Sequence, residues 1–187
     1  MTPIRADTAI VEPVSVAELR LYLRLDPEDG GVEDTLLASL LAAARASVEI
    51  EARRVLVPGR WRIALDDLPA KRWLPLSLSP LVAVVKAARV AADGTVSDLP
   101  AGLVGLGPDP VEKPGLSFAP GLPDVPGSGF LVDVTAGFGG DGPPIPPALR
   151  LAILRLAAAR YEHRGDEPDG AGADAAREAA PFRRLRL

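Results

Sequence analysis

Side chains able to perform acid–base or metal chemistry are scarce in this chain. His163 is the single histidine, and the 187 residues include no cysteine. Histidine-based triads need a partnered nucleophile and an orienting group, and zinc sites usually recruit several imidazoles or thiolates. His163 instead closes an apolar helical pattern, where an imidazolium would face the negative end of the helix dipole. The sequence therefore predicts a surface or helix-capping role for His163.

Carboxylates occur in close groups, and such groups can form the catalytic sites of hydrolases or bind hard cations such as Ca²⁺ and Mg²⁺. These groups are Asp66 and Asp67; Asp26, Glu28 and Asp29; and Asp166, Glu167 and Asp169. The alternating oxygen ligands of an EF-hand, with a distal glutamate, are absent. We interpret the groups as solvated loop charge, and predict no metal site and no catalytic residue. A hydrolase that depends on Asp66 or Asp67 stays open as a further alternative.

Two glycine-rich strings are candidates for a phosphate-binding loop. Residues 102–107 (GLVGLG) follow no clear strand and lead into Pro-Asp-Pro. Residues 137–142 (GFGGDG) follow a strand-like run, but prolines precede the next helix and no Lys-Ser/Thr pair follows. Both strings fail the structural context that nucleotide binding requires, so we predict turns and no cofactor.

Arginines form the more informative groups. Arg53, Arg54, Arg60 and Arg62 lie where a predicted helix ends and a predicted strand begins. They are either a solvated rim or a phosphate-facing patch. The net charge of −4 and the pI near 5.1 argue against a whole surface that binds nucleic acid. A small nucleic-acid-binding regulator that uses this patch is the alternative function.

The last seven residues combine an aromatic, two leucines and three guanidinium groups after a proline. Such a segment has little to pack on within a small domain, and terminal residues are disordered unless they are tied down. Phe and Arg are typical interface anchors. We therefore predict a docking peptide made of Pro181, Phe182, Arg183, Arg184, Leu185, Arg186 and Leu187.

The elements that position these residues are of mixed α+β type. Helices are predicted at about 15–25, 33–54 and 147–163, and Ser15 with Glu18 forms a capping box before the first. The helix 33–54 carries two apolar stripes. One stripe comprises Leu37, Leu41, Ala44 and Val48; the other comprises Leu36, Leu40 and Ala43. This wide apolar arc predicts packing against more than one neighbour.

The middle of the chain, about 57–140, predicts a β-rich insertion between the helices. Strand-like runs recur there between prolines and glycines, and Asp-Gly within 92–95 indicates a hairpin turn. Residues 100–128 hold too many prolines for a central strand, so we expect a long loop or edge strands. The sequence does not distinguish a closed barrel from an open sheet. We divide the chain into an arm (1–13), one domain (14–180) and a tail (181–187).

The N-terminal residues lack the apolar core of a secretory signal, and the apolar runs are interrupted before they reach the length of a membrane span. We therefore expect no membrane association and a cytoplasmic site of synthesis.

The order of five blocks resembles one family. The blocks are VSVAELRLYLRL, DTLLASLLAAARASVEIEARRVL, FLVDVTAGFG, IPPALRLAILRLAAARYEHRG and PFRRLRL. Together they are similar to the head–tail connector (adaptor) proteins of long-tailed phages, a group that includes the adaptors of gene transfer agents. The similarity spans nearly the whole chain and is weakest at about 95–128. The long stretch 100–128 and the acidic segment 165–172 depart from a minimal version of the family.

The resemblance implies a structural protein without enzymatic activity. It implies a homo-oligomeric ring, a dodecamer, that lies beneath the portal protein, extends the DNA channel and presents a surface to the stopper or tail. Residues 181–187 would then dock on the portal or on an adjacent subunit. Arg53, Arg54, Arg60 and Arg62 would line a lumen through which packaged DNA passes without sequence-specific binding. The protein would be incorporated at the neck of a phage or phage-like particle.

Overall fold

The computed structural model describes residues 2–8, 10–26, 31–163 and 176–184, and it has the predicted α+β composition. The chain forms two compact units, and each contains two separated segments of sequence. A β unit comprises residues 1–10 and 57–143, and a helical unit comprises residues 11–56 and 144–187. The assignment of 14–180 as a single domain stays a prediction.

The helical unit is built from α1 (Val16–Leu23), α2 (Asp34–Ala52) and α3 (Pro147–Glu162). The predicted capping box is present before α1: the Glu18 N–H donates to Ser15 Oγ at 3.2 Å, and the Ser15 N–H donates to a Glu18 carboxylate oxygen at 2.8 Å. The bond from the Ser15 N–H to the carboxylate is the main reason that the pKa of Glu18 lies below its usual value. The paired prolines precede α3 as expected, because a proline in the first turn leaves no helical hydrogen bond unmade.

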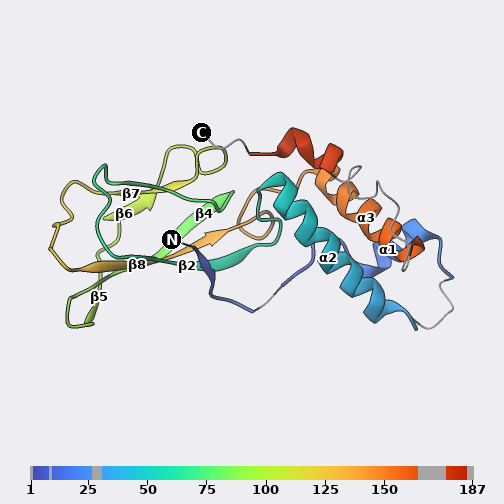
Figure 1. Cartoon of the computed structure of the whole chain (residues 1–187), viewed down its shortest axis with the longest axis horizontal. Coiled ribbons are helices and arrows are strands. Elements are labelled where there is room, and N and C mark those ends of the chain that lie inside the picture. The colour runs from blue at the N-terminus through green and yellow to red at the C-terminus, as the bar shows by residue number, and fades with distance from the viewer. Residues whose placement is uncertain (1, 9, 27–30, 164–175, 185–187) are drawn as a thin grey trace. The chain divides into compact units, whose positions relative to one another are not determined.

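Helices α2 and α3 lie side by side, and α1 contacts both (Figure 1). The first predicted stripe of α2 is the buried one: Leu37, Leu41, Ala44 and Val48 are each at most 1% exposed. Leu149 and Ile153 of α3 are equally buried. Small alanines among these residues let the helix backbones approach closely, while the leucines supply most of the apolar burial.

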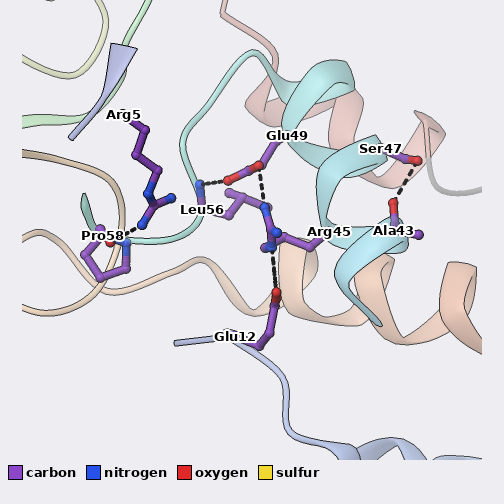
Figure 2. Close-up of polar contacts among 8 residues, drawn as sticks. All are labelled: Arg5, Glu12, Ala43, Arg45, Ser47, Glu49, Leu56 and Pro58. Carbon is purple, nitrogen blue, oxygen red and sulfur yellow. Dashed lines mark hydrogen bonds and ion pairs between the residues drawn. The ribbon is translucent and has the colours of Figure 1, made fainter. Parts of the chain in front are cut away.

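Charged side chains tie the preceding segment to α2. Arg45 donates to Glu12 at 2.8 Å and to Glu49 at 2.7 Å, and Figure 2 shows its guanidinium between the two carboxylates. Glu49 also accepts the backbone N–H of Leu56 at 2.7 Å, just after α2 ends. Arg150 of α3 similarly donates to the Pro13 carbonyl and to a carboxylate of α1. The polar groups of α2 are therefore largely engaged within the unit.

The β unit consists of two open antiparallel sheets. The larger sheet has the order β1-β2-β8-β4-β5 and the smaller has the order β3-β7-β6. In chain order the strands are β1 (Ile4–Arg5), β2 (Gly59–Leu65), β3 (Trp73–Pro75), β4 (Leu81–Val90), β5 (Val96–Asp98), β6 (Val104–Leu106), β7 (Gly115–Phe118) and β8 (Gly129–Ala136). The three longest strands coincide with the strand-like runs of the sequence.

The core of the β unit contains Ile63, Val132 and Val134, which are fully buried, and an edge-to-face pair of rings. This pair is formed by Phe118 of the small sheet and Phe130 of the large sheet, with centroids 6.0 Å apart. The two rings thus connect the sheets in a chain that is only 4% aromatic.

The proline-rich stretch 100–128 is more regular than the sequence indicated. Strand β6 is an edge strand, but β7 is the central strand of the small sheet, so the exclusion of a central strand was wrong. The physical reason is length: the four residues 115–118 contain no proline and fit between Pro114 and Pro120. The hairpin turn at 92–95 is confirmed, with Gly94 at φ +84° and the Thr95 N–H donating to Asp93.

The N-terminal segment is partly ordered by the sheet. Ile4 and Arg5 pair with Arg62 and Trp61 as β1, at the edge of the larger sheet. The Arg5 guanidinium lies 5.7 Å from the Trp61 ring and donates to the Pro58 carbonyl, a contact also drawn in Figure 2. Pairing of this kind satisfies the backbone of an otherwise exposed terminus.

Candidate functional site

The C-terminal segment contacts the end of α2. Residues Ala180–Phe182 form one 3-10 turn, and Arg183 follows in extended conformation. The Arg184 N–H donates to the Ala52 carbonyl at 3.1 Å, and Arg54 Nε donates to the Phe182 carbonyl at 3.1 Å. Residues 182–184 are therefore held against the helix by long-range hydrogen bonds.

This anchoring depends on how α2 ends. Arg53 has φ +52°, a left-handed conformation that stops the helix and turns the chain. Arg54, the next residue, is only 8% exposed, so its guanidinium points into the unit and not toward solvent. Phe182 and Arg184 thus have hydrogen-bond partners within the unit, although residues 180–182 include no buried residue. The expectation that the whole segment 181–187 has little to pack on stays a prediction. Residues 185–187 of the predicted docking peptide lie outside the described residues.

Arg60 and Arg62 lie on the same face of β2, in the β unit. Arg62 donates to both oxygens of Asp133 on β8, at 2.7 and 2.9 Å. Hydrogen bonding to Arg62 is the main cause that holds the pKa of Asp133 below its usual range. Arg60 is exposed, and its backbone N–H donates to Asp7 at 2.6 Å. The positive charge of Arg62 is therefore compensated on this face.

Asp133 and Lys86 are residues that the sequence reasoning missed. Lys86 of β4 faces Asp133 in the sheet register and forms an ion pair with Asp98 at 2.9 Å. This face of the large sheet thus alternates in charge from strand to strand. The available signal was a lone aspartate in the apolar run FLVDVTAGF, because an uncompensated carboxylate is rarely buried.

The four arginines that we grouped in sequence belong to two different units. Arg53 and Arg54 end α2 in the helical unit, whereas Arg60 and Arg62 belong to β2 in the β unit. Within their units, Arg54 donates to the Phe182 backbone carbonyl and Arg62 donates to the Asp133 carboxylate. A channel-facing role for the four arginines stays a prediction.

The remaining candidates occupy peripheral positions. His163 is exposed at the C-cap of α3, and its backbone N–H donates to the Ala159 carbonyl. This position agrees with the predicted surface or capping role. Asp66 and Asp67 are exposed and border an open hollow of about 430 Å³, whose other lining residues carry no ionisable side chain. Asp26 is exposed; the other members of its group and the carboxylates of 166–169 lie outside the described residues.

The glycine strings have different outcomes. Residues 137–142 form the predicted turn after β8, with Gly137, Gly139 and Gly140 at positive φ. Residues 102–107 are not simply a turn, because they include β6. Short edge strands of this kind carry little sequence signal, since three residues show almost no periodicity.

Two further observations apply to the part of the chain that the structure describes. No group of three His, Cys, Asp or Glu side chains there could hold a metal ion. None of the helices described combines the length and apolar character needed to cross a membrane.

Three solved chains resemble this protein over its full length. A chain from the neck of an empty GTA particle, computed with C6 symmetry, matches with a TM-score of 0.83 and 31% identity. A chain from the virion of a native gene transfer agent (GTA) particle matches with a TM-score of 0.78 and 32% identity. A chain from the neck of a native GTA particle, computed with C12 symmetry, matches with a TM-score of 0.79 and 29% identity. Each match covers 100% of this chain and 97% of the other. No protein-family model and no curated protein sequence matches the chain.

These neighbours define a class, the structural proteins of phage-like particles and their necks. Identity above 30% over whole chains, together with the shared α+β fold, extends the likeness beyond architecture alone. The chain belongs to the family of phage-type head–tail connector proteins, which includes the adaptors of gene transfer agents.

Proposed function

We propose that this protein is a head–tail adaptor: a structural ring beneath the capsid portal that extends the DNA channel and presents the attachment surface for the stopper or tail. The observation that carries the proposal is the full-length match to chains from GTA particles, two of them from particle necks. The protein acts by assembly and not by catalysis. It is made in the cytoplasm and then incorporated at the neck.

The ring contains twelve copies in this proposal. This number is supported by two related necks, one computed with C12 symmetry and one with C6 symmetry. A ring of twelve copies is compatible with both symmetries. Rings arise when each subunit joins the next through two different surfaces and the rotation closes.

The C-terminal residues 181–187 dock on the portal or on an adjacent subunit. The anchoring of Phe182 and Arg184 on the end of α2 supports this role, because it fixes the position of this part of the segment. Preorganisation of this kind lowers the entropy cost of docking. Removing residues 185–187 alone leaves the anchor in place and is the variant that tests docking.

Packaged DNA passes through the lumen without sequence-specific binding. Arg53, Arg60 and Arg62 are the proposed channel-facing residues. Arg54, which the sequence grouped with them, is only 8% exposed and binds the Phe182 carbonyl instead. The ion pair between Arg62 and Asp133 supports weak attraction to phosphate, because a neutralised arginine releases few counterions from DNA. The same pairing disfavours the alternative of a nucleic-acid-binding regulator, which would need unpaired positive charge.

The experiment that tests the adaptor role uses particles produced with and without the gene. Without the protein, we expect filled or partly emptied heads that carry no tails and that protect less DNA from nuclease. Electron microscopy of particles with the protein should show twelve copies in the neck. Tailed particles of normal DNA content that lack the protein would refute the proposal.

A further inference from the structure

The exposed side of α2 carries no charged residue over four turns. Leu36, Ser39, Ala43, Ala46 and Ile50 are all exposed, and we call this set the α2 seam. Their spacing is 3, 4, 3 and 4 residues, which is the a/d repeat of a coiled-coil contact. Within the described part of its unit, the seam lies on the side of α2 opposite the buried stripe.

The polar groups near the seam are already satisfied inside the chain. Ser39 Oγ donates to the Thr35 carbonyl at 2.9 Å, so its hydroxyl can be buried without losing a partner. Arg45 and Glu49, the charged residues of α2 between Thr35 and Ile50, bind each other and lie off the seam. The seam can therefore lose its water at little cost.

Helix α3 provides an internal comparison. Its exposed positions include Arg155 and Glu162, as expected for a helix that faces solvent. Leu151 of α3 is 37% exposed, the same as Leu36 of α2, so what distinguishes the α2 seam is the absence of charge together with Ile50 at 74% exposure. Charged residues thus occur among the exposed positions of α3 and are absent from the α2 seam.

A second, different apolar patch lies on α1. Ala17 and Leu21 are exposed one turn apart, with Tyr22 beside them, and Leu21 is 77% exposed. We call these three residues the α1 patch. Two unlike apolar patches on one unit are what a head-to-tail interface between identical subunits requires.

We propose that the α2 seam of one copy packs on the α1 patch of the next copy around the ring. This inference rests on the proposed function, because the cyclic symmetry of the related necks identifies a second copy as the occupant. The small side chains of Ser39, Ala43 and Ala46 form a shallow strip between Leu36 and Ile50. Leu21 and Tyr22 of the neighbour fill that strip as knobs.

Cross-linking tests the contact directly, because the natural chain has no cysteine. Particles are assembled with Ala43→Cys and Leu21→Cys in the same chain, and are treated with a short bismaleimide. We expect a ladder of covalent multimers that extends beyond the dimer, since each copy links to two neighbours. Each single-cysteine variant should give no ladder.

Three outcomes would overturn the proposal. In the first, the double variant enters particles in normal amount but gives no multimers. In the second, Ala43→Cys alone gives dimers, and in the third, the α2 seam cross-links to a different protein. Each of these leaves the adaptor role standing. Absence of the wild-type protein from particle necks would instead refute the proposed function.

A charge placed in the seam gives a second readout. Ala43→Glu should reduce the amount of protein in purified particles at least about tenfold, because an unpaired charge would be buried at the contact. Ala101→Glu, in an exposed turn of the β unit, is the matched control and should be incorporated normally. Both variants should melt like the wild type as isolated chains. Normal incorporation of Ala43→Glu would also refute the contact.

Discussion

Deletion of residues 181–187 is the perturbation that best tests how the C-terminal segment is held. The sequence alone indicates that this short terminal segment has little to pack on, which would leave the melting temperature unchanged. The structure instead has Arg54, 8% exposed, donating to the Phe182 carbonyl. Loss of one partner of a buried charged hydrogen bond costs about 1.5–3 kcal/mol.

We therefore expect the deletion to lower the free energy of unfolding by about 2 kcal/mol. For a chain of this size, that corresponds to a fall of roughly 4–8 °C in Tm. The assay is thermal unfolding of the isolated protein followed by circular dichroism. Deletion of 185–187 alone is the control and should leave Tm within about 1 °C, as expected for residues beyond the anchor.

A double-mutant cycle isolates the contact from other effects of truncation. Arg54→Met should lower Tm by a similar amount, and combining it with the deletion should add little. Equal melting of the wild type and the 181–187 deletion would refute the reasoning. Full additivity of the two changes would show that Arg54 and the segment act independently.

Three further predictions concern the two units. Asp133→Asn should destabilise the protein at pH 7, as measured by urea unfolding. Because the folded-state pKa of Asp133 is lowered, the difference in unfolding free energy between wild type and variant should be full above about pH 5 and should vanish as the pH falls through that lowered pKa. Gly137→Ala should lower the free energy of unfolding by about 1–3 kcal/mol, since Gly137 has φ +122° and an added Cβ would lie 2.6 Å from a backbone carbonyl oxygen. Gly121→Ala is the control and should be neutral, because open space surrounds Gly121. Leu41→Ala should cost about 2–5 kcal/mol in urea unfolding with little change in m, because its side chain is 1% exposed, and a smaller loss would mean that the helices close over the cavity.

The sequence by itself determined most of the local structure. The capping box, the paired prolines before α3, the strand-like runs of β2 and β8 and the Asp-Gly turn all act through dihedral preferences and local composition over a few residues. The sequence also shows directly that histidine and cysteine side chains are scarce. The order of the blocks was sufficient to suggest the connector family, which the full-length structural matches then established.

Tertiary structure decided which of these residues meet. Arg54 and Phe182 are 128 positions apart, and Arg62 and Asp133 are 71 apart, so no local pattern could reveal either pair. The small sheet is a similar case, because β7 is stabilised by strands on both sides and not by its own four residues. The sequence also indicated two apolar stripes on α2, but only the packing of α1 and α3 decided that one stripe is buried and that the seam stays open. Whether a side chain is buried depends on the fold of the whole chain, because contacts between residues distant in sequence form only when the chain folds.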